Sequence, residues 1–93
     1  MNSGVYALTN TKTGEVYVGS SYNIWVRAEQ HFHALETHSH HNYWLQKSYD
    51  RHPDSFAFCI LETTPVENIR TREQLWIHRM RTHLLNIQMK VTL

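Results

Sequence analysis

The sequence predicts an α+β domain in which a small three-stranded antiparallel sheet is flanked by three helices. Three observations lead to this fold class: two short β-prone runs separated by a turn, two helical patterns that follow them, and an apolar strand before a last long helix. The expected order is ββααβα. With 93 residues and no repeat, low-complexity tract or linker, the chain is expected to form a single domain over residues 1–93.

The first two strands are predicted over residues 4–9 and 15–19, which are rich in β-branched and aromatic residues. Between them, residues 10–14 read Asn-Thr-Lys-Thr-Gly, a composition typical of turns. A register that places Ala7 opposite Val16 also places Tyr6 opposite Tyr17 on the other face. The two phenol rings are therefore expected to be neighbours across a hairpin.

Two helices are predicted to follow the hairpin. The first extends from Asn23, a residue that suits a helix N-cap, to Glu36, with apolar residues at helical spacing and Trp25 widening their stripe. The second covers residues 40–51 and stops at His52-Pro53, because proline cannot continue a helix.

The third strand, residues 56–61, is predicted to be the buried central or covered strand, because apolar residues occupy both of its faces. Its lone cysteine, Cys59, is expected in the core, and a single cysteine argues against a disulfide framework. A long third helix is predicted from Pro65 to near Asn86, with an apolar stripe from Ile69 to Leu84.

Composition and charge narrow the possible functions. A chain this short is expected to rely on its aromatic residues for much of the core and to offer only a shallow cleft, which suits a polymer substrate. The formal net charge of +1 predicts modest affinity for nucleic acid. No apolar run approaches the roughly 18 residues of a membrane span, and no secretory leader is visible, so no membrane association and a cytoplasmic location are expected.

Three charged or titratable side chains break the apolar pattern of their helices. His31 falls within the stripe of the first helix, and Arg27 lies one turn before it. A satisfied core histidine and a surface arginine are the simpler interpretation. Glu73 falls near the middle of the third-helix stripe, where a carboxylate is costly unless it is paired with Arg70 or Arg27 or binds a cation such as Mg²⁺.

Two other polar groupings carry less information. The run His38-Ser39-His40-His41 suggests zinc, but it lacks thiolates and a second ligand pair, so no structural zinc site is predicted. The third helix also carries four arginines, for which a solvated helix face is the default and phosphate contact the alternative. They are Arg70, Arg72, Arg79 and Arg81.

The hairpin residues resemble a known signature. Gly4-Val5-Tyr6 and, after ten intervening residues, Tyr17-Val18-Gly19 resemble the GIY-YIG nuclease motif with valine in place of isoleucine at both sites. The resemblance continues along the chain through an arginine, a histidine, a glutamate and a late asparagine, and it looks like the catalytic domain of phage intron-encoded homing endonucleases. These residues are Arg27, His31, Glu73 and Asn86.

The resemblance implies a metal-dependent endonuclease that hydrolyses DNA phosphodiester bonds. The implied catalytic residues are Tyr6, Tyr17, Arg27, His31 and Glu73, with Glu73 holding one Mg²⁺ or Mn²⁺ ion. Gly19, His40 and Asn86 are implied to support the site or to contact nucleic acid. The resemblance favours Tyr6 as the general base, whereas ordinary pKa values near 10 for a phenol and 6.5 for an imidazole favour His31.

Two departures from the family pattern matter. Ser20 stands where many members carry a basic residue, and the chain ends soon after the catalytic core, so the separate DNA-targeting domain of the homing enzymes is expected to be absent.

The expected partner is duplex or branched DNA, with RNA left open, and a transient homodimer or a separate targeting chain is a further expectation. If the protein is phage-encoded, the host cytoplasm is its expected location. The alternatives are a non-catalytic nucleic-acid-binding module on the same scaffold and a small interaction protein whose tripeptides are accidental.

Overall fold

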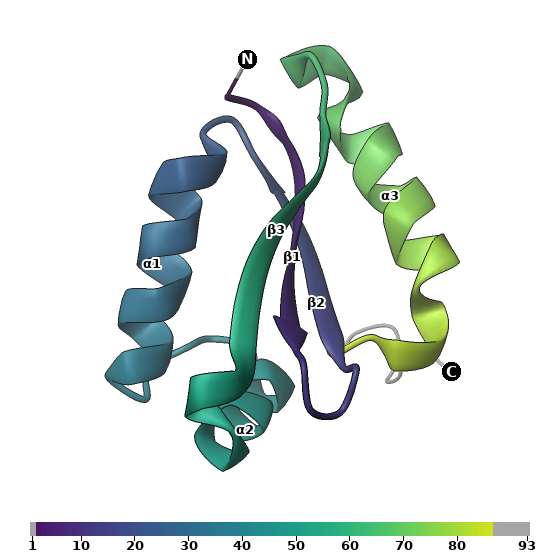
Figure 1. Ribbon diagram of the computed structural model, residues 1–93. Helices are drawn as coiled ribbons and strands as arrows, with labels where there is room; N and C mark the ends of the chain where they lie inside the picture. The colour runs from purple at the N-terminus through teal and green to yellow at the C-terminus, as the bar shows by residue number, and fades with distance from the viewer. Residues whose placement is uncertain (1, 87–93) are drawn as a thin grey trace.

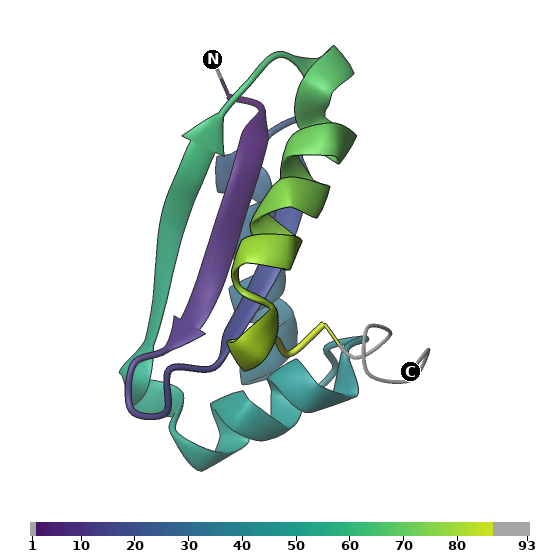
Figure 2. The ribbon, with the colours of Figure 1, turned by 90° about the vertical axis from the view of Figure 1, so that its right-hand side faces the viewer.

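The structure, a computed structural model that describes residues 2–86, has its elements in the predicted order. The strands β1 (Gly4–Asn10), β2 (Val16–Ser21) and β3 (Phe56–Thr63) form one antiparallel sheet in the order β2-β1-β3. Helices α1 (Ile24–Glu36) and α3 (Ile69–Arg79) lie on opposite sides of this sheet, and α2 (Tyr43–Arg51) lies below one end of it (Figures 1 and 2). The α+β prediction is therefore confirmed.

The hairpin forms as predicted, but its predicted register was wrong. Tyr6 pairs with Gly19, and Tyr17 pairs with Leu8. The reason is a four-residue turn over residues 11–14, closed by a 2.8 Å hydrogen bond from the Asn10 amide to the Glu15 carbonyl. Tyr6 and Tyr17 therefore share a face of the sheet as diagonal neighbours rather than as a directly opposed pair.

The helices differ from their predicted bounds mainly at their ends. Asn23 caps α1 as predicted, accepting a hydrogen bond from the Val26 amide, but Trp25 lies outside the buried stripe with 58% of its surface exposed. Helix α2 begins at Tyr43 rather than at residue 40, because the side chain of Asn42 caps it. Helix α3 ends at Arg79, and the short 3-10 turns Val66–Asn68 and Arg81–His83 flank it.

The predicted position of the third strand was wrong. β1 is the central strand, with Val5, Ala7 and Leu8 fully buried, whereas β3 is an edge strand and Cys59 is exposed. Apolar residues on both faces of β3 do not distinguish the two positions, because helices cover its faces only in part. The chain order of the strands does not reveal which one lies in the middle.

Two apolar clusters hold the layers together, one on each face of the sheet. Val5 and Val18 pack with Ile77 of α3, while Leu8 packs with Leu35 of α1 and Leu45 of α2. The expectation that aromatic residues supply much of the core holds only in part. Within residues 2–86, Tyr6 is the one Phe, Tyr or Trp among the buried core residues. Other aromatic side chains pack against the two clusters while partly buried, namely Tyr17, Phe32, Tyr49, Phe56, Phe58 and Trp76. Across the same residues, no helix is long and apolar enough to cross a membrane.

Candidate active site

Strands β1 and β2 and helix α1 bring Tyr6, Tyr17 and His31 together on one face of the sheet. The phenol oxygen of Tyr6 lies 2.6 Å from Nε2 of His31. The His31 ring meets the rings of Tyr6 and Tyr17 edge to face, with both pairs of ring centroids 5.4 Å apart. His31 is buried within the α1 stripe, as the sequence predicted, and its polar atoms are satisfied by this cluster.

A hydrogen-bond chain continues from His31 to His40 and on to the backbone. Nδ1 of His31 lies 2.7 Å from Nε2 of His40, and Nδ1 of His40 accepts a 3.0 Å hydrogen bond from the backbone N–H of Asn42. A backbone amide can only donate, so Nδ1 of His40 carries no proton. A neutral His40 therefore carries its proton on Nε2 and donates it to Nδ1 of His31. Because Nδ1 of His31 accepts this hydrogen bond, a neutral His31 carries its own proton on Nε2, which faces Tyr6.

Burial keeps the imidazoles of His31 and His40 neutral, as the hydrogen-bond chain from Asn42 to Tyr6 requires. Burial, with a smaller contribution from the charge of His40, lowers the pKa of His31 to about 3. Burial and the neighbouring His41 lower the pKa of His40 to about 4. At neutral pH each ring therefore has one proton, and the chain has a single direction, from the Asn42 amide to the Tyr6 oxygen.

The two phenols respond to the same environment in the opposite sense. Burial is the largest cause that raises the pKa of Tyr6 well above its ordinary value, and the Arg27 guanidinium opposes this shift through its charge and a hydrogen bond to the phenol. Burial and the charge of Glu73 also raise the pKa of Tyr17. The oxygen of Tyr6 thus accepts hydrogen bonds from His31 and Arg27. The phenol proton of Tyr6 takes part in neither bond and is free to be donated to another acceptor.

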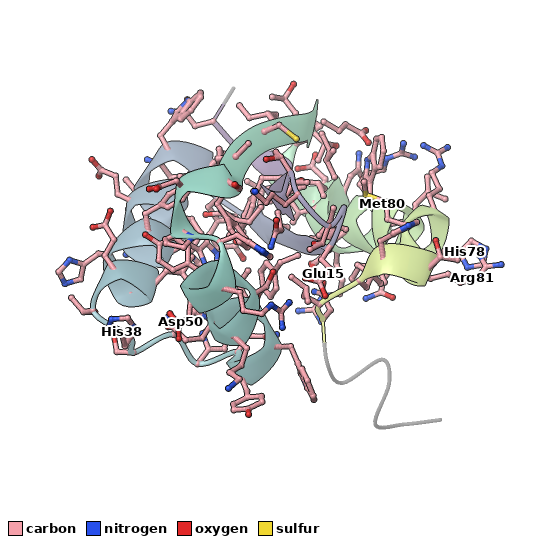
Figure 3. The ribbon with its side chains drawn as sticks, turned by 60° about the horizontal axis from the view of Figure 1, so that its bottom comes forward. Glu15, His38, Asp50, His78, Met80 and Arg81 are labelled. Carbon is pink, nitrogen blue, oxygen red and sulfur yellow. The ribbon has the colours of Figure 1, made fainter. Side chains whose placement is uncertain are left out.

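The loop that carries His40 is fixed at several points. The His40 backbone N–H donates to Oε1 of Gln46 at 3.0 Å, and Asn42 caps α2. Figure 3 shows His38 and Asp50 together at the edge of α2, and Nδ1 of His38 lies 3.2 Å from Oδ1 of Asp50. The position of His40, which the sequence reached only through resemblance, is therefore set by the start of α2.

Gly19 provides the space that the Tyr6 ring occupies. The two residues are paired across β1 and β2, and a Cβ atom at position 19 would lie 2.5 Å from the Tyr6 oxygen and 2.6 Å from its Cζ. Any larger residue therefore displaces the phenol. This is a physical reason for the glycine that the resemblance implies.

Asn86 supports the site through the backbone of β2. Its side chain accepts a hydrogen bond from the Val18 N–H at 3.1 Å and donates one to the Val18 carbonyl at 2.8 Å. The Leu85 N–H donates to the Val16 carbonyl at 2.6 Å. The segment after α3 thus covers the free edge of β2. Asn86 is a positioning residue, because it fixes the backbone of the strand that carries Tyr17 and Gly19.

Glu73 lies on α3, on the opposite side of the sheet from His31. It nevertheless belongs to the same region, because it lines one cleft together with Ser20 of β2 and Arg27 of α1, and its charge acts on Tyr6 and Tyr17. Its Oε1 accepts a 2.7 Å hydrogen bond from the Ser20 hydroxyl. Within residues 2–86 it forms no ion pair, so the salt bridge to Arg70 or Arg27 that the sequence left open is not formed.

Arg27 links two hollows in the surface. The larger one, about 630 Å³, lies between α3 and the junction of β2 with α1, and the smaller one, about 240 Å³, lies beside the histidines. Both are open clefts, as expected for so small a domain. Arg27 contributes to both, with Ser20, Tyr22, Arg70 and Glu73 on the larger one and with His31, His40 and His41 on the smaller one.

The metal-binding capacity of the cleft is small. Across the described part of the chain, no three His, Cys, Asp or Glu side chains are grouped closely enough to hold an ion. Glu73, which forms no ion pair within residues 2–86, is the carboxylate whose charge acts on both Tyr6 and Tyr17. One carboxylate suits Mg²⁺, which keeps most of its waters, better than zinc, which takes three or four protein ligands.

Two residues of the site were not predicted from the sequence. Ser20 attracts attention in the sequence only as a departure from a family pattern, although its place two residues after Val18 puts it on the α3 face of β2. Asn42 falls inside the predicted helix 40–51, although an asparagine directly before an apolar helical pattern is a common N-cap signal. That signal indicates a helix start after Asn42 and places His40 in the preceding loop.

Similarity to known proteins is found by family, by sequence and by structure. A family model described as the GIY-YIG catalytic domain matches residues 2–88. The chain is 37% identical over 86 residues to Intron-associated endonuclease 1 of Enterobacteria phage T4. The matched region covers 90% of this chain and 35% of that protein. The chain thus spans about a third of the length of this curated relative.

Two solved structures are also similar. One is a mutant catalytic domain of intron endonuclease I-TevI, with a TM-score of 0.85, 35% identity and coverage of 94% of each chain. The other is the catalytic domain of homing endonuclease I-TevI, with a TM-score of 0.82, 33% identity and coverage of 88% of this chain and 96% of that one. The similarity therefore extends over the whole described fold.

Proposed function

Because the chain belongs to the GIY-YIG family of catalytic domains, we propose that it is a metal-dependent endonuclease that hydrolyses phosphodiester bonds of DNA. The observation that carries the proposal is the one-way hydrogen-bond chain that ends on the Tyr6 oxygen, beside Arg27 and a cleft that contains Glu73. A structural role alone does not call for this many buried polar groups around one phenol.

The direction of the hydrogen bonds favours Tyr6 over His31 as the general base. Nε2 of His31 carries a proton and faces Tyr6, and its Nδ1 is occupied by the proton of His40. His31 therefore has no free lone pair for a water proton, and its low pKa makes it a poor base. The Tyr6 oxygen, in contrast, receives hydrogen bonds that stabilise a phenolate.

Tyr6 must lose its own proton before it acts as a base. In the free protein, burial and nearby negative charge hold its pKa above the ordinary value, so at neutral pH the phenol is protonated. When bound, a divalent cation held by Glu73 would supply positive charge that offsets part of this effect and would stabilise charge on the leaving oxygen. Tyr6 releases its phenol proton to bulk water and then, as a phenolate, takes the proton of the attacking water. The water oxygen bonds to phosphorus as the bond from phosphorus to the leaving oxygen breaks, and solvent protonates the leaving oxygen.

Arg27 and Glu73 have the complementary roles in this mechanism. Arg27 is an exposed cation between the two clefts, where it neutralises charge that develops on the non-bridging phosphate oxygens. Glu73 is the residue to hold one Mg²⁺ or Mn²⁺ ion, with Ser20 orienting its carboxylate. Tyr17 packs against His31 and His40 and keeps the histidine pair in place.

One active site per chain makes a single-strand nick the expected product. A cut through both strands then requires a second copy of the chain, a separate targeting partner or two successive encounters. The small net charge predicts weak binding to DNA by the described domain itself, so the assay needs protein at high concentration and low salt.

The direct test is cleavage of supercoiled plasmid with Mg²⁺ or Mn²⁺, with EDTA as the metal-free arm. Glu73→Gln keeps the size of the side chain and its ability to accept from Ser20, but removes the charge that holds a cation. Glu67→Gln is the matched control, because Glu67 lines the same cleft. We expect nicking in metal that Glu73→Gln reduces by at least about a hundredfold and Glu67→Gln leaves within about twofold.

A folded wild-type protein that binds DNA but cuts neither plasmid, branched DNA nor RNA in either metal would contradict the proposal. That outcome would favour a non-catalytic nucleic-acid-binding module on the same scaffold. Circular dichroism and thermal melting of each variant separate loss of chemistry from loss of folding.

A further inference from the structure

The larger cleft is also lined by residues that have no role in the proposed mechanism. Two of them are Tyr22, at the junction of β2 and α1, and Arg70, in the first turn of α3. The cleft volume of about 630 Å³ lies within the range of sites that take small ligands, so there is room for a nucleotide beside the scissile phosphate.

Arg70 differs from the other arginines of the C-terminal region. Arg72 pairs with Glu62 at 2.9 Å, Arg79 lies over the Trp76 ring, and Arg81 donates to the His78 carbonyl at 3.1 Å. Arg70 is exposed and, within residues 2–86, has no ion pair, hydrogen bond or ring contact. It is thus a cation available to a ligand, and it lines the same cleft as Arg27.

Tyr22 is the matching aromatic feature. Its side chain is 74% exposed although it lines the cleft, and its ring packs on no other ring within the described residues. An exposed aromatic ring beside a basic groove is the combination that proteins use to hold a single strand, with the ring against a base or sugar and the cation on a phosphate. Both side chains are exposed, so neither belongs to the buried core.

The spacing fits an adjacent nucleotide. Arg70 and Glu73 are three residues apart on α3, so their side chains lie on one face, within one helical turn of about 5.4 Å. Successive phosphates of one strand advance by about 3.4 Å along a duplex. A phosphate one or two nucleotides from the bond that is cut therefore reaches Arg70 when the scissile phosphate lies near Glu73 and Arg27.

We propose that Tyr22 and Arg70 form a subsite for the nucleotide next to the scissile phosphate, with Arg70 binding its phosphate and the Tyr22 ring packing on its base or sugar. The inference rests on the proposed function for its place on the strand. Its ligand is the sugar-phosphate backbone of nucleic acid, and Arg70 contributes to binding rather than to the chemical step.

The experiment combines binding and cleavage of a fluorescent 20-nucleotide duplex by the whole chain. Binding is measured by anisotropy over a series of salt concentrations, in the Glu73→Gln background so that no cutting occurs. Cleavage supplies kcat and KM. The variants are Arg70→Ala and Tyr22→Leu, and the matched control is Arg81→Ala, whose arginine lies beyond the end of α3 next to His78 (Figure 3).

We expect Arg70→Ala to weaken binding and raise KM by about tenfold, to lower the salt slope of binding by about one, and to leave kcat within about twofold. Tyr22→Leu should weaken binding by a similar factor without changing the salt slope, because it removes a contact and no charge. Arg81→Ala should match the wild type in every measurement.

The outcomes separate the subsite from the proposed function. If the wild type cuts DNA and Arg70→Ala binds and cuts like Arg81→Ala, the subsite is wrong and the nuclease stands. If nothing is cut but Arg70→Ala lowers the salt slope, the contact of Arg70 with a backbone phosphate stands, whereas the nuclease and the place of this contact beside a cut bond are wrong. A fall in kcat with an unchanged KM would also overturn the subsite, because it would place Arg70 in the chemical step.

Discussion

At the scale of single residues, the site depends on where protons lie as much as on which residues are present. One backbone amide, that of Asn42, determines the tautomer of His40, and through it that of His31. The last donor in the chain then faces the Tyr6 oxygen. A histidine that is usually considered as a base is thereby converted into a donor that supports a neighbouring phenolate.

This arrangement predicts the tautomers of both histidines. Long-range ¹⁵N–¹H NMR spectra should show the Nε2–H form for His31 and for His40, since Nδ1 of each accepts a hydrogen bond. Because the pKa values lie near 3 and 4, neither ring should titrate between pH 5.5 and 8. An Nδ1–H signal from His31, or its titration near pH 6.5, would contradict the assignment of Tyr6 as the base.

Gly19 gives a second residue-scale prediction. Gly19→Ala places a methyl group 2.5 Å from the Tyr6 oxygen, so the phenol must move, and a displacement of about 1 Å costs on the order of a hundredfold in rate. Cleavage by Gly19→Ala is therefore expected to fall by about that factor while the protein stays folded.

Gly14→Ala is the matched control for this change. Gly14 has a φ of 81° in the hairpin turn, where alanine is strained by about 1 kcal/mol, yet its nearest neighbour is the His83 ring at 3.8 Å. It should lower the melting temperature and leave the rate of cleavage nearly unchanged. Equal rates for the two variants would show that the space above Gly19 is unimportant.

At the scale of elements, the sequence predicts whether a segment forms a helix, a strand or a turn better than it predicts the place of a strand in the sheet. The hairpin and the capped start of α1 followed from local chemistry, because turn residues and N-caps act over a few residues. The central place of β1 and the edge place of β3 did not, because strand order is decided by contacts between distant parts of the chain. The same limit explains why Cys59 was wrongly expected in the core.

The free edge of β2 yields the element-scale prediction. Asn86→Ala removes two hydrogen bonds from the backbone of Val18, which is fully buried, and leaves both groups without a partner. We expect a loss of about 2 to 4 kcal/mol in the free energy of unfolding, measured by urea denaturation.

Asn68→Ala is the comparison for that change, since Asn68 precedes α3 without a side-chain capping bond and should lose little stability. Cleavage by Asn86→Ala, measured where the variant remains folded, should fall less than cleavage by Glu73→Gln, because Asn86 acts only through β2. An unchanged unfolding curve for Asn86→Ala would show that the segment after α3 does not secure the strand edge.

At the scale of the whole molecule, the site combines residues from the two helical layers that the sheet separates, because α1 and α3 both contribute to the larger cleft. Alternation along β1 and β2 placed Tyr6 and Tyr17 on one face, and helical spacing placed His31 and Arg27 towards it. Glu73, on the other face, was expected at the site only through its anomalous place in the α3 stripe and through resemblance. Its contact with Ser20 of β2 depends on the packing of α3 on the sheet, which no local pattern contains.

The two neutral histidines also link the site to the stability of the whole fold. Unfolding restores an ordinary pKa near 6.5, whereas the folded pKa of His31 is about 3, so between these values the unfolded chain binds a proton that the folded chain does not. The free energy of unfolding should therefore fall as the pH falls from about 6.5, by at most about 1.4 kcal/mol per pH unit for each such histidine, and His40 adds a similar contribution.

Urea denaturation of the wild type and of His31→Gln between pH 7.5 and 4.5 measures this dependence. His31→Gln is expected to be less stable at pH 7.5 and to lose stability less steeply on acidification, because one of the two linked protons is gone. His33→Gln, a change at an exposed position two residues along the same helix, should keep the wild-type slope. Parallel pH curves for His31→Gln and the wild type would mean that His31 takes up a proton equally well in both states, and the neutral hydrogen-bond chain to Tyr6 would then be excluded.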